Sequence, residues 1–197
     1  MNFAYKVAHP ASNDFSENFD GHGSVLLACF GDPGLLALRE IATVPVVGLG
    51  QSSFMAAAAR GRFAIVTGGK PWEAMLYRFV RSHQLEAHLA GIQTVELTGM
   101  QIAAAPEQAL DMLAAAAARG VAEGAQWIVL GGAAMGGLAP HLQVRVTVPV
   151  LDNIALAAQV VQDIVANPQP PFVRAGMPYA LLGAGAALTR LMLKPCG

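Results

Sequence analysis

The chain has 197 residues, of which 54% are hydrophobic and 13% charged, and its net charge at pH 7 is −1. These values predict a globular protein with a large core, and they exclude the strongly basic surface of a nucleic-acid-binding protein. The two cysteines, Cys29 and Cys196, are too far apart and too few for a disulfide framework, so we expect a reducing, cytoplasmic environment.

Apolar runs bounded by turn residues alternate with helical segments along most of the chain. The predicted strands are residues 25–29, 44–48, 63–67, 92–97, 127–130 and 148–151, with a weak strand signal at 3–8. The predicted helices are residues 33–42, 52–60, 71–83, 106–122, 153–165 and 180–193. This alternation is typical of a parallel α/β fold. We expect no signal peptide and no membrane span, because the first 24 residues are polar and the most apolar segment, near the C-terminus, is too short.

The first predicted strand ends at Cys29, just before a turn that contains Asp32 and Pro33. Asp as N-cap and Pro at the first helical position predict a helix start there. Ligands of open parallel sheets bind at the carboxyl ends of the strands, and a helix N-terminus stabilises a thiolate. Cys29 is therefore a candidate reactive thiol with a lowered pKa. The alternative is a buried, reduced cysteine that only packs.

An internal repeat predicts where the second half of the site lies. The sequence Thr-Val-Pro-Val stands at residues 43–46 and again at 147–150, and each copy follows an apolar strand, a glycine-containing turn and a short helix. Alignment of the two halves puts Gly132 opposite Cys29. Duplicated α/β units usually face each other across a cleft, so we expect these two residues on opposite walls of one site.

Other catalytic motifs are weak in this sequence. No group of His, Cys, Asp and Glu residues has metal-ligand spacing, and residues 48–50 lack the third glycine of a dinucleotide fingerprint. His141 is the only histidine expected near the site. Residues 67–70 are not a P-loop, but their glycine-rich turn before a helix is suited to binding a carboxylate through backbone N–H groups.

The segment Cys-Phe-Gly-Asp-Pro-Gly at residues 29–34 resembles the aspartate/glutamate racemase superfamily, specifically its hydantoin and allantoin racemase branch. The likeness continues at residues 39–40, 45–50, 63–67, 128–131 and 149–152. The resemblance implies an α/β fold of two pseudo-symmetric lobes, with parallel sheets flanked by helices and a cleft between the lobes. The first lobe would comprise residues 1–48 with 152–197 and be shortened relative to the family, and the second would comprise residues 49–151.

The resemblance also implies roles for individual residues. Family members work without a cofactor: one cysteine removes the proton next to a carbonyl group, and a second returns a proton to the opposite face. Cys29 matches the first cysteine, whereas Gly132 stands at the position of the second. The implied substrate-binding residues are Phe30, Gly31, Thr67, Gly68, Gly131, Gly132 and Ala133. Thr67 and Gly68 would hold a carboxylate or ring carbonyl, and the turn at 131–133 would supply backbone donors.

Three functions remain open on this basis. The first is a cofactor-independent racemase or epimerase of an amino acid or hydantoin-like compound, with Cys29 as acid/base. The second is a one-cysteine enzyme similar to a decarboxylase or isomerase. The third is a catalytically inactive paralogue that binds a carboxylate, because Gly132 replaces the second cysteine. We expect a small carboxylate or cyclic ureide as ligand, neither metal nor cofactor, no nucleic-acid or membrane partner, and a homo-oligomer.

Overall fold

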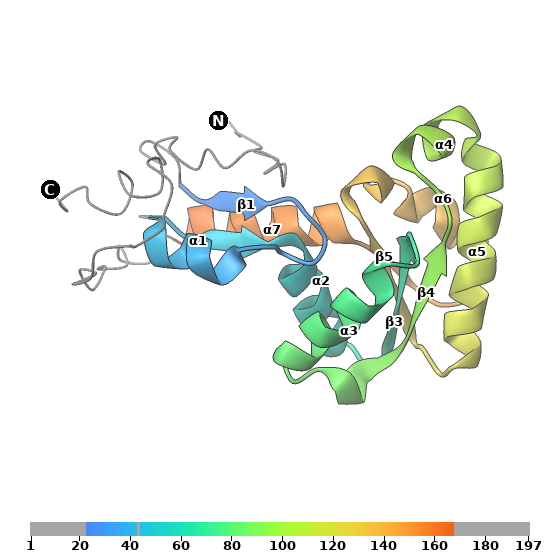
Figure 1. Ribbon diagram of the computed structural model, residues 1–197, viewed down its shortest axis with the longest axis horizontal. Coiled ribbons are helices and arrows are strands. Elements are labelled where there is room, and N and C mark those ends of the chain that lie inside the picture. The colour runs from blue at the N-terminus through green and yellow to red at the C-terminus, as the bar shows by residue number, and fades with distance from the viewer. Residues whose placement is uncertain (1–22, 43, 168–197) are drawn as a thin grey trace, which may run out of the picture.

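The structure, a computed structural model, describes residues 23–42 and 44–167, which form a mixed α/β fold with parallel sheets flanked by helices (Figure 1). The prediction of an α/β fold with parallel sheets flanked by helices is thereby confirmed. The segments 3–8 and 180–193, for which a strand and a helix are predicted, lie outside the described residues.

The larger sheet has four parallel strands in the order β4-β3-β5-β6. Its strands are β3 (Phe63–Gly68), β4 (Leu89–Val95), β5 (Trp127–Gly131) and β6 (Val150–Asp152). Alternate residues of β3 pack on opposite faces: Ala64 and Val66 contact the core beneath α5, whereas Ile65 joins the core shared by α2, α3 and α7. Both faces are covered, which explains why β3 and β5 read as nearly continuous apolar runs.

Four helices cover the faces of this sheet. They are α2 (Leu49–Ala58), α3 (Trp72–Ser82), α5 (Pro106–Ala122) and α7 (Asn153–Ala166). The bounds of α5 match the prediction, because Pro106 fits the first turn and Gly124 follows the last. Asp152 caps α7 by accepting hydrogen bonds from the N–H groups of Ile154 and Ala155.

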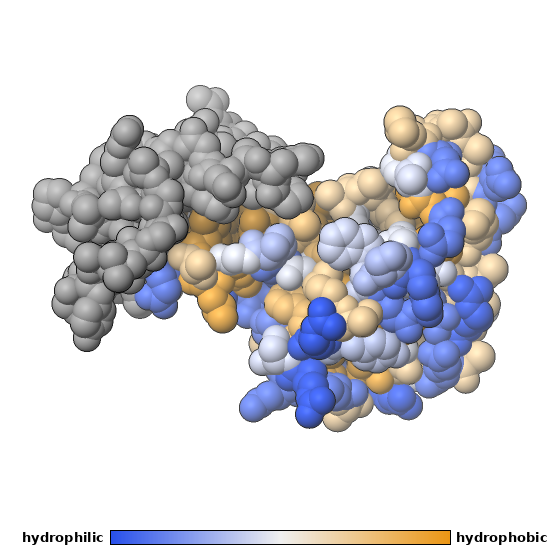
Figure 2. Space-filling view, viewed as in Figure 1, coloured by the Kyte–Doolittle hydropathy of each residue, from blue (hydrophilic) through white to orange (hydrophobic). Residues whose placement is uncertain are grey.

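The smaller sheet pairs β1 (Val25–Leu27) with β2 (Val46–Gly48) in parallel. Helix α1 (Leu35–Ile41) covers it through a cluster that contains Leu35 and Leu38. Helix α7 packs against both sheets. Figure 2 shows apolar residues exposed around α1, whereas hydrophilic and apolar residues are interspersed over α3 and α5.

Short helical elements complete the fold. They are α4 (Gly99–Ala104), α6 (Ala139–Gln143) and the 3-10 helices at Glu86–His88 and Ala133–Met135. Helix α4 is not predicted from the sequence, although Thr98 and Gln101 form a capping box, which is a sequence signal for a helix start. Within residues 23–42 and 44–167 no helix is both long and apolar enough to cross a membrane.

Candidate active site

A cavity of about 600 Å³ opens where strands of both sheets end. Cys29 follows β1, Thr67 and Gly68 end β3, Glu96 follows β4, and residues 131–135 lie at and beyond the end of β5. The carboxyl ends of parallel strands therefore meet at one edge, which is where ligands of such sheets bind.

Most residues implied by the family resemblance line this cavity. The lining includes Cys29, Phe30, Thr67, Gly68, Gly131, Gly132 and Ala133. Gly31 does not line it. A side chain at Gly31 would meet Met75 instead, and the backbone N–H of Gly31 lies against Gly50. Gly31 thus belongs to the packing that positions Cys29.

The turn after Cys29 differs from the predicted helix start. Helix α1 begins at Leu35 and its N-cap is Gly34, at φ +78°. The Asp32 carboxylate is engaged elsewhere: it accepts hydrogen bonds from the N–H groups of Gly50 (2.9 Å) and Gln51 (2.7 Å) in the first turn of α2. Asp32 therefore caps a helix that begins 17 residues later in the chain.

Close packing holds this turn against both sheets. A Cβ atom at Gly48 would lie 2.2 Å from Oδ2 of Asp32, so only glycine leaves room for the capping carboxylate. The ring of Phe30 lies so close to Gly131 that a Cβ atom there would be 2.3 Å from it. The same ring packs edge-on against Phe54, with ring centroids 5.3 Å apart. Phe30 thus brings the Cys29 turn against the end of β5.

The environment of Cys29 favours the protonated thiol. Partial burial raises the pKa of the Cys29 thiol, and the negative charge of Asp32 raises it further. The expected lowering of this pKa is therefore wrong. Its physical reason is that the acidic residue after Cys29 caps α2, and no helix N-terminus formed by Asp32 and Pro33 faces the sulfur. A protonated thiol is suited to donating a proton.

The turn after β5 carries hydrogen-bond donors but no cysteine. Gly132 lies at φ +120°, and an added Cβ atom would meet only the hydroxyl of Thr67, at 3.9 Å. Its carbonyl accepts from the N–H of Met135 and starts the 3-10 helix Ala133–Met135. The first N–H groups of a helical turn lack partners within that turn, so they are available to an oxygen of a ligand.

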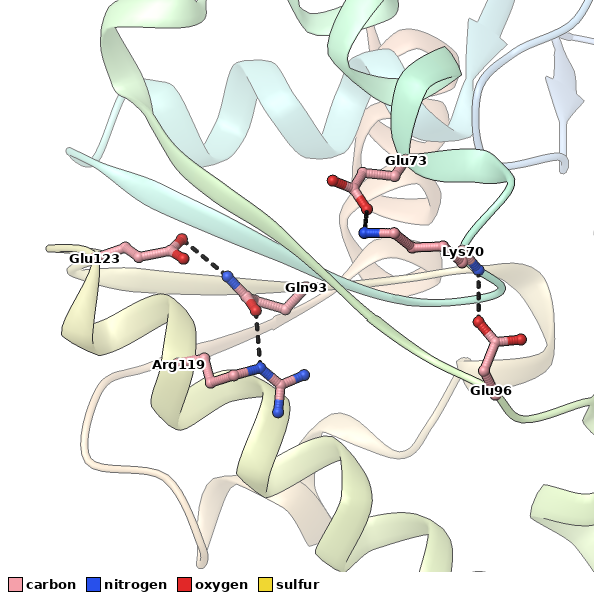
Figure 3. Close-up of polar contacts among 6 residues, drawn as sticks. All are labelled: Lys70, Glu73, Gln93, Glu96, Arg119 and Glu123. Carbon is pink, nitrogen blue, oxygen red and sulfur yellow. Dashed lines mark hydrogen bonds and ion pairs between the residues drawn. The ribbon is translucent and has the colours of Figure 1, made fainter.

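Several lining residues are not among the candidates from the sequence, and Glu96 and Trp72 are two of them. Glu96 follows β4 and accepts a hydrogen bond from the backbone N–H of Lys70 at 2.9 Å (Figure 3). Trp72, at the start of α3, is 53% exposed at the cavity. The predicted strand 92–97 includes Glu96, whereas β4 ends at Val95 and leaves Glu96 at the cavity edge.

No set of three His, Cys, Asp or Glu side chains is grouped as metal ligands in the part of the chain that the structure describes. His141 is exposed on α6 and is absent from the cavity lining. The chemistry of the lining is therefore that of a thiol, a carboxylate, hydroxyl groups and backbone amides.

Comparison with known proteins adds independent information. The model of the family described as Asp/Glu/Hydantoin racemase matches residues 13–161. Hydantoin racemase from Pseudomonas sp. (strain NS671) is 33% identical over 148 residues, which are 74% of this chain and 59% of the relative. Hydantoin racemase from Paenarthrobacter aurescens is 36% identical over 143 residues, which are 72% of this chain and 61% of the relative.

Among solved structures, allantoin racemase from Klebsiella pneumoniae superposes with a TM-score of 0.74 at 28% identity, covering 87% of this chain and 71% of that one. The chain spans about six tenths of the length of the two curated relatives.

Proposed function

We propose, since the chain belongs to the Asp/Glu/Hydantoin racemase family, that it acts as a cofactor-independent racemase or epimerase with Cys29 as an acid/base. The substrate would be a hydantoin-like cyclic ureide or an amino acid. The observation that carries the proposal is the cavity in which the Cys29 thiol shares a lining with Thr67 and the turn at 131–133.

The reaction would begin with removal of the proton next to a carbonyl group. The electron pair of the C–H bond then moves toward that carbonyl and gives an enolate. Donors fixed in a partly enclosed cavity stabilise such developing negative charge. The Thr67 hydroxyl and the backbone N–H groups at Ala133 are the donors proposed for the carbonyl oxygen, or for a carboxylate if the substrate has one.

Cys29 would transfer the proton on one face of the enolate. Its raised pKa supports the role of proton donor at neutral pH, because the thiol is then the populated form. The return reaction uses the thiolate as the base. A working thiol must stay reduced, and we therefore include a cytoplasmic location in the proposal.

The separate β1–β2 sheet beside the four-stranded sheet supports a division into two lobes that meet at this cavity. We place residues 1–48 with 152–197 in the first lobe and residues 49–151 in the second. Cys29 and Gly132 would then lie on different lobes.

Deuterium exchange in heavy water tests the proposal. Single enantiomers of a 5-substituted hydantoin, allantoin, aspartate and glutamate are incubated with the protein, and deuterium uptake and optical rotation are followed together. We expect deuterium at the α-carbon and inversion for at least one compound, and loss of inversion in Cys29→Ser. Absence of exchange with every compound would refute the proposal.

A one-cysteine reaction is the second candidate, and Gly132 is the observation that favours it. Glycine offers no proton-transferring group at the position that corresponds to the second cysteine of the family. Protonation of one face only, as after decarboxylation of a disubstituted malonate, would need Cys29 alone. In the same heavy-water assay this candidate predicts exchange with retention of configuration, or release of carbon dioxide from a malonate.

A further inference from the structure

Two titratable side chains of the described residues line the cavity, Cys29 and Glu96. Racemisation through an enolate requires a proton-transferring group on each face of the α-carbon, and Gly132 supplies none. We propose that Glu96 is the second proton-transferring group of this site, opposite Cys29. This inference rests on the function proposed above and names the missing partner.

The order of the strands places the two groups on either side of Thr67. Strand β3, which carries Thr67, lies between β4 and β5. In register, Thr67 pairs with Thr94 on one side and with Gly131 on the other. Phe30 packs on Gly131, which brings the Cys29 turn to the β5 side, whereas Glu96 follows the end of β4. A substrate held at Thr67 is therefore flanked by a thiol and a carboxylate.

The Glu96 carboxylate is held in place and keeps an oxygen free. Oε1 accepts from the backbone N–H of Lys70, and Oε2 has no hydrogen bond from any described residue. The Lys70 ammonium group forms its ion pair with Glu73, not with Glu96 (Figure 3). Glu96 is thus anchored by a neutral donor, and its second oxygen remains available as a base.

The proton transfers balance between the two groups. In one direction a Glu96 oxygen takes the α-proton, and the C–H electron pair enters the enolate. The Cys29 S–H then breaks and a new C–H bond forms on the opposite face, which leaves a glutamic acid and a thiolate. Exchange with water returns both groups to a carboxylate and a thiol. The opposite enantiomer reacts with the other protonation state, in which the Cys29 thiolate takes the α-proton and the protonated Glu96 returns one. The raised pKa of Cys29 agrees with the thiol as the resting acid.

The test compares Glu96→Gln, Cys29→Ser and the matched control Glu73→Gln. Glu73 contacts the same lysine but does not line the cavity. Positioned acid/base groups contribute roughly 10²- to 10⁴-fold, so we expect Glu96→Gln to lose inversion by such a factor and Glu73→Gln to stay within about twofold of wild type. Circular dichroism and thermal unfolding check that all three variants fold.

The decisive readout is which enantiomer still exchanges deuterium. Glu96→Gln should exchange, with retention, only the enantiomer whose α-proton faces Cys29, and Cys29→Ser only the other one. A purely structural role would not produce this mirror-image pattern. If wild type racemises and Glu96→Gln inverts at the wild-type rate, or both variants keep the same enantiomer, the assignment of Glu96 is wrong while the proposed function stands. If wild type exchanges deuterium into neither enantiomer, both the proposed function and the assignment of Glu96 are refuted.

Discussion

A Cβ atom built on Gly132 would have the hydroxyl oxygen of Thr67, 3.9 Å away, as its nearest neighbour. Space is therefore available at Gly132, and the obstacle to a side chain is the backbone, at φ +120° and ψ 136°. At Gly131 the situation is reversed, because a side chain would collide with the ring of Phe30.

We expect Gly132→Ala to lower the free energy of unfolding by about 1–3 kcal/mol, because an L-residue is strained at this φ. Gly131→Ala should cost a similar amount through overpacking and should also displace Phe30 with the Cys29 turn. Urea titration measures both costs. The rate at which iodoacetamide labels Cys29 separates the two variants, since only Gly131→Ala should move Cys29. An equal change of that rate in both would contradict the packing described for Phe30.

The second prediction concerns the thiol of Cys29. Because its pKa is raised by burial and by Asp32, alkylation by iodoacetamide at pH 7 should be slower than in the urea-unfolded chain. The labelling rate should rise only well into the alkaline range. A Cys196→Ser background leaves one cysteine to follow, and mass spectrometry gives the rate. Rapid labelling of the folded protein at neutral pH would show a lowered pKa instead.

Asp32 gives a prediction of how stability depends on pH. Its pKa is raised in the folded protein, chiefly by burial, against the lowering effect of the hydrogen bonds from Gln51 and Gly50. A raised folded pKa means that the stabilising contribution is complete below the unfolded value of about 4 and is lost as the pH rises through the folded value. Between the unfolded and the folded pKa of Asp32, the free energy of unfolding of wild type should therefore fall relative to that of Asp32→Asn. Urea titrations at a series of pH values measure both free energies. A difference between them that does not change with pH would contradict the raised pKa.

Removal of the capping oxygens is a separate test of Asp32. Asp32→Ala leaves the N–H groups of Gly50 and Gln51 without their acceptor, and we expect a loss of about 0.5–2 kcal/mol. Asp152→Ala, which uncaps α7, is the matched control for helix capping. Asp32→Ala should reduce exchange activity in addition, because the turn that carries Cys29 is no longer tied to α2.

The homo-oligomer also stays a prediction. Leu36 on α1 is 75% exposed and Val165 on α7 is 43% exposed, and both helices pack on the small β1–β2 sheet. Light scattering after size exclusion should give a multiple of the mass of the chain. Leu36→Glu should lower that mass, whereas Met100→Glu, at an equally exposed position on α4, should not. A monomer over a wide concentration range would refute the expectation.

The sequence predicts well those features that depend on neighbouring residues. Helix α5 begins at Pro106 and ends before Gly124, and α7 is capped by the residue directly before it. The apolar runs of β3 and β5 likewise lie in the sheet, and the residues at their ends line the cavity. In each case the residues that determine the element lie within a few positions of it in the sequence.

The turn after Cys29 could not be predicted from local sequence, because the partners of Asp32 are Gly50 and Gln51 in another element. An Asp-Pro pair has the same local signal whether Asp caps the next helix or a distant one. The pKa of Cys29 is raised first by burial, and the charge of Asp32, placed by this long-range contact, raises it further. Glu96 is not identified from the sequence for a different reason. Its position at the cavity depends on where β4 ends, and local sequence predicts the ends of strands poorly.

The two sheets differ in their local stability, and this difference has a consequence for the cavity. A two-stranded pair with three residues on each strand has little stability of its own, whereas β3 lies at the interior of a four-stranded sheet. Amide hydrogens of β1 and β2 should therefore exchange with solvent through small openings, and those of β3 only on global unfolding. Cys29, after β1, and Thr67, on β3, would then belong to different cooperative units. The part of the cavity that carries the thiol could open locally while the part that carries the hydroxyl group stays folded.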